Sequence, residues 1–415
     1  MKHGFFNVKH MEEVEDILTR QAEEYPLKKE LIPIQEGLGR IISRDINASS
    51  DLPKFNRSTV DGFAVVCQDA YGATESIPCF LNYLGEVFMG EETDFKIHSG
   101  ETVYVPTGGM VPEGTEAMVM IEYSEKLDLD TILIHKPVGI GENISYIGDD
   151  IKLNEVINKK GTKITSYDIG LFAGMGITAV EVFAKPRITI ISTGDEIVEI
   201  NQETTIGQVR DINGYALQAL VTELGATVVS KLLIRDDFEL LKEGMDSGLL
   251  NSDIIIISGG SSVGMRDYTK DLVESYDSSE VLVHGISVKP GKPTIVGAIK
   301  GKMVFGLPGH PVSALTVCKQ VVGSYIKQLM FMSQNEVYIH ATLANSVHGA
   351  PGRDTFQMVS LVEENEKWIA VPIHGKSGMM SLLTKASGYF KISMDKEGCN
   401  QNDIVKVYLL QEVFI

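Results

Sequence analysis

The middle of the chain alternates short apolar runs with longer, more polar segments of helical character. The runs that suit buried strands are 187–191, 227–233, 254–257, 281–287, 294–298 and 302–305. The segments that suit helices are 214–224, 236–249, 267–275 and 312–330. Short β-branched runs bounded by turn residues favour strands that are covered on both faces. Strands that alternate with helices in this way predict a three-layer α/β domain over residues 186–332.

Both flanks of this predicted domain show strand-like patterns instead. In residues 51–140, short apolar runs are separated by Gly, Pro and Asp, which is typical of a β domain. Strands return over residues 333–415 and predict a small β-barrel there. The clearest of them are 337–343, 355–362 and 404–410. Near the N-terminus, Met11–Tyr25 gathers its apolar residues on one helical face and predicts an amphipathic helix.

Three of the central strands end in a small, polar turn that leads into a polar or helical segment. These turns contain Thr193, Gly194 and Glu196, then Ser258, Gly259, Gly260, Ser262 and Gly264, and finally Pro308, Gly309, Pro311 and Ser313. In an open parallel sheet such turns gather at the carboxyl edge, where ligands bind. Glycine turns let backbone N–H groups approach an oxyanion, and a helix N-terminus favours negative charge. The sequence has neither a Walker lysine pattern nor a GxGxxG motif, so an ordinary P-loop or Rossmann site is not indicated.

The chain is acidic, with a formal net charge of −19. Such a charge repels nucleic acid, and no long run of Lys and Arg offsets it. The one suggestive cationic cluster is Lys289 and Lys292, which flank Pro290-Gly291 and precede Pro293. Because the prolines restrict this turn, both ammonium groups are expected to be held in place. A small anionic ligand therefore suits the chain better than a polynucleotide.

The sequence also bounds the cellular compartment. No apolar run approaches the roughly 20 residues that span a bilayer, and the first residues form no secretory signal. The cysteines at positions 67, 79, 318 and 399 are scattered without a CxxC pair, which argues against a disulfide framework, a zinc ribbon or an iron–sulfur site. The histidines show no HxxxH or HExxH spacing, so we expect them on the surface or in the core. These features favour a cytoplasmic protein.

Carboxylates accompany the three turns. Asp236 and Asp237 lie between a strand and a helix, and Asp267 follows the glycine turn just before the next helix. Asp in such a position is often an ordinary helix N-cap. Mg²⁺ prefers oxygen ligands, so Asp236 and Asp267 are also candidates for a magnesium site. From the residues alone, capping and metal binding both remain open.

Longer motifs occur along nearly the whole chain and share one resemblance. They are FNRSTVDGFAV at 55–65, PTGGMVPEGTEAMVMIE at 106–122, GENISYIGDDI at 141–151, STGDE at 192–196, GQVRDINGY at 207–215, SGGSSVGMRDY at 258–268, VKPGKP at 288–293 and GLPGHPVSA at 306–314. In this order they resemble the molybdopterin molybdenumtransferase family, which includes MoeA and the E domain of gephyrin and plant Cnx1. A single motif could arise by chance, whereas the ordered set is specific.

The resemblance implies a four-domain architecture. Its parts are an N-terminal helix with an elongated discontinuous domain (1–50 and 141–185), an inserted β domain (51–140), a central MogA-like α/β molybdopterin-binding domain (186–332) and a C-terminal β-barrel (333–415). It also implies a homodimer in which the N-terminal domains of one subunit face the α/β domain of the other. The further site residues that it implies are Asp61, Thr107, Glu122, Asp150, Arg353 and Ser377. From the residues alone, Asp61-Gly62 would be an ordinary hairpin turn.

The implied activity is the insertion of molybdate into adenylyl-molybdopterin with release of AMP. Mg²⁺ is the implied cofactor, and the adenylyltransferase of the same pathway is a further candidate partner. The catalytic residues would be Asp61, Glu196, Asp236 and Asp267. Lys289, Lys292, Arg353 and the Ser377 hydroxyl would together form a molybdate cradle, since charged and hydroxyl donors suit an oxyanion.

Some positions depart from the family pattern, and two alternative functions stay open. His310 stands where many relatives have Asn, Asn56 where Asp is common, and Ser261 where Val is common, which bears on ligand selectivity. A molybdopterin adenylyltransferase shares the α/β domain, but the flanking β domains argue against that reading. A scaffold that binds receptors, as gephyrin does, is the other alternative. A chain with neither a linker nor a fused domain gives it no support.

Overall fold

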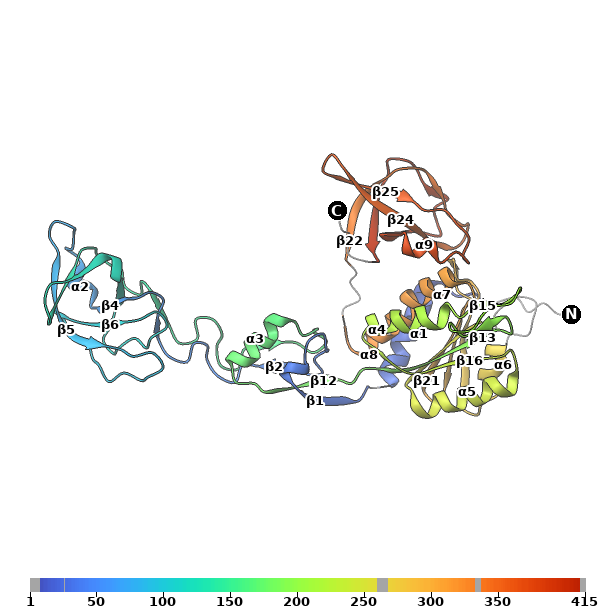
Figure 1. Ribbon diagram of the computed structural model, residues 1–415, viewed down its shortest axis with the longest axis horizontal. Coiled ribbons are helices and arrows are strands. Elements are labelled where there is room, and N and C mark those ends of the chain that lie inside the picture. The colour runs from blue at the N-terminus through green and yellow to red at the C-terminus, as the bar shows by residue number, and fades with distance from the viewer. Residues whose placement is uncertain (1–7, 26, 260–267, 333–336, 411–415) are drawn as a thin grey trace.

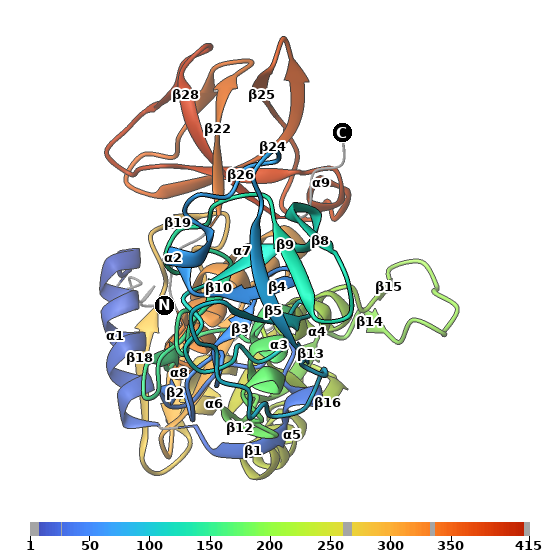
Figure 2. The ribbon, with the colours of Figure 1, turned by 90° about the vertical axis from the view of Figure 1, so that its left-hand side faces the viewer.

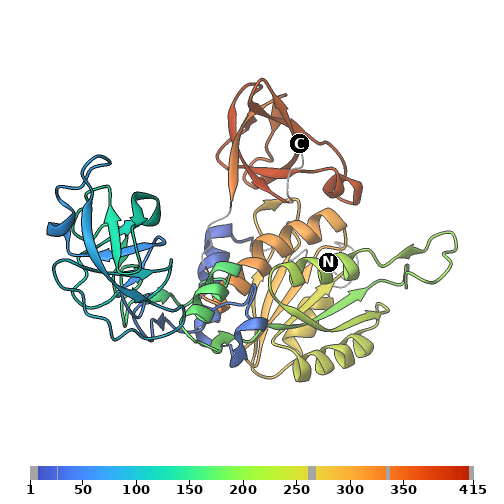
Figure 3. The same cartoon turned by 60° about the vertical axis from the view of Figure 1, so that its left-hand side comes forward.

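The computed structural model describes residues 8–25, 27–259, 268–332 and 337–410. The molecule is elongated (Figure 1). A β-sheet unit formed by early residues lies at one end, and an α/β unit lies at the other with a C-terminal barrel beside it. A narrow middle segment joins the two ends. Figure 3 shows the same arrangement with the barrel standing over the α/β unit.

The α/β unit contains a sheet of six strands in the order β16-β13-β17-β21-β20-β18. Their bounds are β13 (Arg187–Thr193), β16 (Thr227–Ile234), β17 (Ile254–Ser258), β18 (Ser279–His284), β20 (Ile295–Ile299) and β21 (Lys302–Leu307). The first four in spatial order are parallel, whereas β20 and β18 are antiparallel to their neighbours. The apolar run 254–257 is fully buried because helices cover both of its faces. This confirms the predicted α/β architecture.

Helices form the two outer layers of this unit. One layer contains α1 (Met11–Glu24), α4 (Asn213–Glu223), α7 (Pro311–Val317) and α8 (Gly323–Leu329), and the other contains α5 (Phe238–Asn251) and α6 (Tyr268–Glu274). The predicted single helix over 312–330 is wrong in one respect, because a π-helical segment, Cys318–Val322, separates α7 from α8. The apolar face of α1, with Val14 and Leu18, packs into the same core as Tyr325 of α8.

The early residues form a second sheet of six strands in the order β7-β4-β6-β5-β9-β8. Their bounds are β4 (Gly62–Val65), β5 (Cys79–Glu86), β6 (Glu101–Val105), β7 (Ala117–Met120), β8 (Ser124–Lys126) and β9 (Thr131–Ile134), with the short helix α2 (Cys67–Ala70). Figure 2 views this sheet from its own end of the molecule. The Gly, Pro and Asp residues between the apolar runs of 51–140 therefore lie between strands, as predicted.

The narrow middle segment pairs two stretches that are far apart in the sequence. The antiparallel pairs are β1 (Lys29–Pro33) with β12 (Ala179–Phe183), β2 (Ile46–Asn47) with β11 (Val156–Asn158) and β3 (Arg57–Ser58) with β10 (Ile144–Ser145). Helix α3 (Ser166–Gly174) packs beside them, and its Phe172 is buried with Ile42 and Val182. The small size of this core explains why the segment is so thin in Figure 1.

The C-terminal residues form a closed barrel. Its strands follow the order β24-β25-β22-β28-β26, and β26 pairs back onto β24. The bounds are β22 (Tyr338–Leu343), β24 (Asp354–Glu364), β25 (Lys367–Pro372), β26 (Gly388–Ile392) and β28 (Ile404–Leu409), with β23 (Val347–His348), β27 (Gly398–Cys399) and α9 (Ser381–Thr384) between them. The predicted barrel is confirmed. Across the described ranges, no helix has the length and apolar character needed to cross a membrane.

Candidate functional site

Three parallel strands of the central sheet end side by side, as the sequence predicts. In the register of the sheet, Ser192 of β13 is opposite Ser258 of β17, which is opposite Leu307 of β21. Gly259 follows β17 with φ 113°, and a Cβ atom there would lie 2.1 Å from the Thr193 carbonyl oxygen. Only glycine fits this close approach. Gly260, Ser262, Gly264 and Asp267 lie outside the described residues.

The two aspartates after β16 have different partners. Asp237 is an N-cap, because its side chain accepts a 3.0 Å hydrogen bond from the Leu240 N–H in the first turn of α5. Asp236 instead accepts a 2.5 Å hydrogen bond from the Thr193 hydroxyl, at the end of β13. The Glu196 carboxylate lies close over Gly194, 2.9 Å from the position that a Cβ atom would take. Asp236 is therefore the member of the pair that belongs to the carboxyl edge.

The described residues bear on the predicted magnesium site at this edge. Within the described part of the chain, no three His, Cys, Asp or Glu side chains are close enough to hold a metal ion. Mg²⁺ usually binds through one or two carboxylates together with substrate phosphates and water. Asp236 supplies one such carboxylate, and the other predicted ligand, Asp267, is not described. Among the described residues, this edge therefore offers Asp236 as one candidate ligand and no complete magnesium site.

The short segment between β15 (Val209–Arg210) and α4 also contributes to the carboxyl edge of the sheet. Asp211 is buried and accepts hydrogen bonds from the Ser192 hydroxyl at 3.0 Å and the Gly214 N–H at 2.8 Å. Its other oxygen lies 3.4 Å from the Lys231 ammonium. Burial opposes the charge on Lys231, but Asp211 and the neighbouring Tyr215 and Glu199 raise its pKa overall. From the motif GQVRDINGY we expected Asp211 at the same edge as Glu196, whereas its hydrogen-bond partners are apparent only in the structure.

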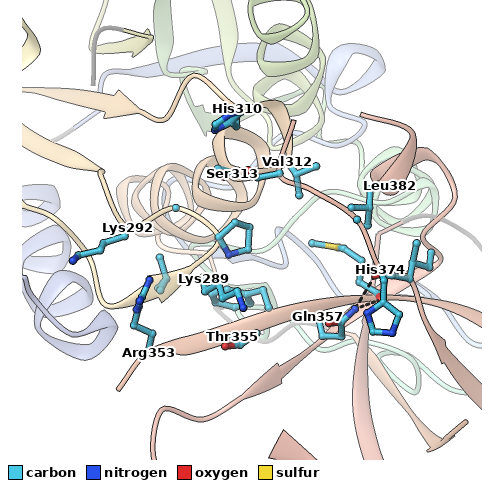
Figure 4. A pocket seen from close by; sticks show the side chains of 18 of the residues that line it. Lys289, Lys292, His310, Val312, Ser313, Arg353, Thr355, Gln357, His374 and Leu382 are labelled. Atoms are coloured by element: carbon cyan, nitrogen blue, oxygen red, sulfur yellow. Dashed lines mark hydrogen bonds between the residues drawn. The ribbon is translucent and has the colours of Figure 1, made fainter. Parts of the chain in front are cut away.

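A basic cavity of about 650 Å³ separates the α/β unit from the C-terminal barrel (Figure 4). Lys289, Lys292 and Pro293 line it from the turn after β19 (Val288–Lys289), and Pro308 and Ser313 line it from the turn and helix after β21. Arg353 and Ser377 come from the barrel. The structure thus brings together the residues predicted to form an anion cradle, although they are distant in the sequence.

Backbone pairing places Arg353 beside the lysine turn. Strand β19 pairs in parallel with β24, so that Lys289 is opposite Thr355. On the other side, the Ser287 hydroxyl donates a 2.7 Å hydrogen bond to the Gly352 carbonyl oxygen. The barrel and the α/β unit are therefore joined next to the cavity, which orders both sources of positive charge.

Three histidines also line the cavity: His310, His348 and His374. Each is exposed, which agrees with the predicted surface location, but their shared location around one cavity was missed. Gln357 lies next to His374 in Figure 4 and donates 2.9 Å hydrogen bonds to the carbonyl oxygens of Met358 and Ile373. The spacing of these residues along the chain carries no signal of their convergence, because they belong to two different units.

The predicted site residues of the early part of the chain lie elsewhere. Thr107 donates two hydrogen bonds to Asp61, and the carbonyl oxygen of Asp61 accepts one from the Ile121 N–H next to Glu122. This group belongs to the distant β-sheet unit (Figure 1). Asp150 lies in the connecting region, where its N–H donates to the Leu52 carbonyl oxygen. Within one chain, these residues do not meet the basic cavity.

The remaining predicted residues belong to the turn after β21. Pro311 is the first residue of α7, one helical position before the cavity-lining Val312. The Gly309 carbonyl oxygen accepts a 2.8 Å hydrogen bond from the Asn213 side chain. The helix predicted over 312–330 therefore begins one residue earlier, at Pro311. Proline suits the first helical position, because the N–H that it lacks would have no partner within the helix there.

Three family models match the chain. They are MoeA N-terminal region (domain I and II) over residues 9–176, Probable molybdopterin binding domain over 189–328, and MoeA C-terminal region (domain IV) over 340–410. A molybdopterin biosynthesis protein of Methanocaldococcus jannaschii is 33% identical over 98% of this chain and 99% of its own length. A molybdopterin molybdenumtransferase of Haemophilus influenzae is 29% identical over 92% of this chain and 94% of its own length.

Solved structures agree with the sequence matches. A MoeA protein from Pyrococcus horikoshii covers 98% of this chain and 100% of its own, with a TM-score of 0.84 and 35% sequence identity. A second structure of a MoeA protein from the same organism covers 97% of this chain with a TM-score of 0.83 and 28% identity. The similarity therefore extends over the whole elongated molecule and is not confined to the α/β unit.

Proposed function

The chain belongs to the MoeA family, and we propose that it is a molybdopterin molybdenumtransferase. In this proposal it inserts molybdate into adenylyl-molybdopterin and releases AMP, as a step of molybdenum cofactor biosynthesis. Water breaks the phosphoanhydride bond, which releases AMP and leaves a phosphate on the pterin, and the two dithiolene sulfurs bind the metal as one molybdate oxygen leaves as water with the two thiol protons. The protein has to bring a dianion to a substrate that already carries phosphates, so it must offset their repulsion.

The observation that carries this proposal is the basic cavity beside the carboxyl edge. Lys289, Lys292 and Arg353 line one space in a chain of net charge −19. A small tetrahedral anion suits such a space, because ammonium and guanidinium groups form short, charge-assisted hydrogen bonds with oxyanions. The Ser377 residue lines the same space and can add a neutral donor. We assign molybdate to this cavity.

The adjoining strand ends suit the rest of the substrate. The turn after β21 leads directly into α7, where backbone N–H groups favour phosphate, and the turn after β13, which leads into β14 (Ile197–Val198), lies at the same edge of the sheet. Asp236 would hold Mg²⁺ there together with the substrate phosphates and Asp267, and the ion would offset charge on the phosphoanhydride. Glu196 completes the group of carboxylates that we assign to the reaction. Positioning of the two anions is expected to supply much of the rate.

We also propose that the working enzyme is a homodimer. Asp61, Thr107 and Glu122 form one group on the far β-sheet unit, well separated from the cavity of the same chain (Figure 1). If they act on the substrate, a second subunit must supply them. A dimer in which each end faces the partner's α/β unit provides this arrangement and would create two equal sites.

The surroundings of the enzyme follow from its substrate. The molybdopterin adenylyltransferase of the same pathway would supply adenylyl-molybdopterin, and direct transfer between the two proteins would protect it. The four cysteines are unpaired, which suits a reducing cytoplasm. Neither nucleic acid nor a membrane is needed, and the negative charge of the chain disfavours the former.

Molybdate-dependent AMP release tests the proposal. Purified protein is incubated with adenylyl-molybdopterin, with and without molybdate, and AMP is measured by chromatography. We expect AMP release only when molybdate is present. An adenylyltransferase would instead consume ATP and molybdopterin, and a scaffold would release nothing. Either of those outcomes would contradict the proposed function.

A further inference from the structure

Asn213 connects two of the turns that surround the proposed substrate site. It is the first residue of α4, and only 8% of its surface is exposed. Its Nδ2 atom donates to the Ser258 hydroxyl oxygen and to the Gly309 carbonyl oxygen, at 2.8 Å each. One amide nitrogen therefore joins the end of β17 to the turn after β21.

These two partners determine which way the amide group faces. An amide side chain can turn either its nitrogen or its oxygen toward a neighbour, and the hydrogen-bonding character of the neighbours decides which. The Gly309 carbonyl oxygen can only accept a hydrogen bond, and only the nitrogen of Asn213 can donate one. The nitrogen must therefore face Gly309, and Oδ1 must point in the opposite direction.

The Oδ1 atom of Asn213 accepts no hydrogen bond from the described residues. It is buried, and no donor within hydrogen-bond distance of it occurs in the part of the chain that the structure describes. Buried acceptors in native proteins almost always have a partner, so an unpaired one calls for an explanation. This atom also lies at the N-terminal end of an 11-residue helix, beside the last residue of β17, Ser258. A ligand at the carboxyl edge would supply the missing donor.

The chemistry of the atom restricts the kind of ligand group. Ionised phosphate and molybdate oxygens are acceptors and would be repelled by a carbonyl oxygen. A pterin ring carries an exocyclic amine and ring N–H groups, which are donors. We propose that Asn213 contacts the pterin, with Oδ1 accepting a hydrogen bond from a ring N–H or amine while Nδ2 holds the two turns. This inference rests on the proposed function and assigns a residue for the ring, whereas the basic cavity receives the metal oxyanion.

The test uses the full-length protein and compares the two ligands. In Asn213→Ala, the dissociation constant for molybdopterin, measured by titration, should rise about tenfold to a hundredfold, since a buried hydrogen bond is lost. Asn213→Ala also removes the Nδ2 atom that holds the turn of Pro308 and His310, which line the molybdate cavity, so the half-saturating molybdate concentration for AMP release should rise as well. Asn213→Asp keeps an acceptor oxygen and loses the amide donor, so it should disturb molybdate use to a similar extent and yet bind molybdopterin more tightly than Asn213→Ala. If Asn213 only held the turns, the two variants would bind molybdopterin equally weakly, and that result would overturn the proposal.

Thr189 offers a matched control. It is the third residue of β13, toward the opposite end of the strand from the site, and its buried hydroxyl oxygen also has no hydrogen-bond partner among the described residues. Thr189→Val should leave molybdopterin binding unchanged. Where Asn213→Ala does not fold, Asn213→Ser keeps a residue suited to a helix start and should show the same weakening.

Failure of the inference and failure of the function are separable. A wild-type protein that releases no AMP on addition of molybdate contradicts the proposed function. The other case is a wild-type protein that releases AMP on addition of molybdate and an Asn213→Ala variant that binds molybdopterin as tightly as the wild type. That result contradicts only the assignment of Asn213.

Discussion

Thr107 donates two hydrogen bonds to a single carboxylate oxygen of Asp61, one from its backbone N–H at 2.8 Å and one from its hydroxyl at 3.0 Å. The pair is held on the β-sheet unit, at the opposite end of the molecule from the basic cavity (Figure 1). Burial, followed by the nearby charge of Asp61, raises the pKa of the adjacent Tyr104. A carboxylate fixed so firmly in an exposed location suits a role toward a second subunit.

Complementation between inactive variants tests that role. Asp61→Ala and Asp236→Ala should each abolish molybdate-dependent AMP release while leaving the fold intact, because neither side chain belongs to an apolar core. Mixing the two proteins should restore part of the activity, since a hybrid dimer contains one intact site. The measurement is AMP release after subunit exchange has been verified by native mass spectrometry. Verified exchange without any recovery would argue against a shared site.

Lys292 should govern molybdate use. Lys292→Ala removes a charged donor from the cavity, and a hydrogen bond to a charged group contributes about 1.5–3 kcal/mol. The half-saturating molybdate concentration for AMP release should therefore rise about tenfold to a hundredfold, and high molybdate should rescue the variant. Arg353→Ala should behave similarly. Lys292→Arg should rescue poorly, because a planar guanidinium does not replace a compact ammonium.

Lys367 provides the control for the cavity lysines. It begins β25 on the same barrel, is exposed, and does not line the cavity. Lys367→Ala removes the same charge from the protein and should leave the molybdate dependence unchanged. If Lys292→Ala and Lys367→Ala behave alike, general electrostatics explains the effect and the assigned cradle is wrong.

Two glycine substitutions should change stability in opposite directions. Gly259→Ala introduces a Cβ atom 2.1 Å from the Thr193 carbonyl oxygen at a positive φ, so it should destabilise the protein by more than about 1 kcal/mol. Gly170 lies within α3, and a Cβ atom added there would have no other atom within 4 Å. Gly170→Ala should therefore stabilise the protein by about 0.5–1 kcal/mol. Calorimetric melting temperatures compare both variants with the wild type. An equal or raised melting temperature for Gly259→Ala would contradict the steric argument.

The cap of α3 should make part of the stability dependent on pH. Burial opposes ionisation of Asp168, but hydrogen bonds from Thr165 and Asn158 outweigh it and lower its pKa below the ordinary 3.8. A lowered folded-state pKa stabilises the protein above the unfolded value, and this contribution is lost as the pH falls through the folded value. Asp168→Ala should therefore cost about 1 kcal/mol at neutral pH.

The acid range supplies the check on this prediction. The difference in melting temperature between wild type and Asp168→Ala should shrink as the pH is lowered below 3.8. Asn158→Ala removes one of three donor groups, the other two being the N–H and the hydroxyl of Thr165, and should reduce the pH dependence without removing it. A difference that stays constant into acid would mean that Asp168 acts through packing and not through its charge.

Local sequence patterns determined the elements and the chemistry of their ends. The apolar run 254–257 predicts a doubly covered strand because both of its faces need apolar side chains. Gly259 is predicted as a turn residue because it begins a small, glycine-rich stretch just after this apolar run. Lys289 and Lys292 stand out as a cationic cluster in an acidic chain. Each of these inferences depends on neighbours in the sequence, and such neighbours can be read without the fold.

Only the tertiary structure decided which distant segments meet. The pairing of β19 with β24 places Arg353 beside the lysine turn, and backbone hydrogen bonds of this kind carry little side-chain signature. Likewise, the unpaired Oδ1 of Asn213 becomes visible only when Ser258 and Gly309 occupy the nitrogen of the same amide. The packing of α1 against α8 depends on complementary surfaces more than 300 residues apart in the chain. These are contacts between residues that are far apart in the sequence. Local sequence patterns do not show which distant residues meet, because that depends on how all the elements pack together.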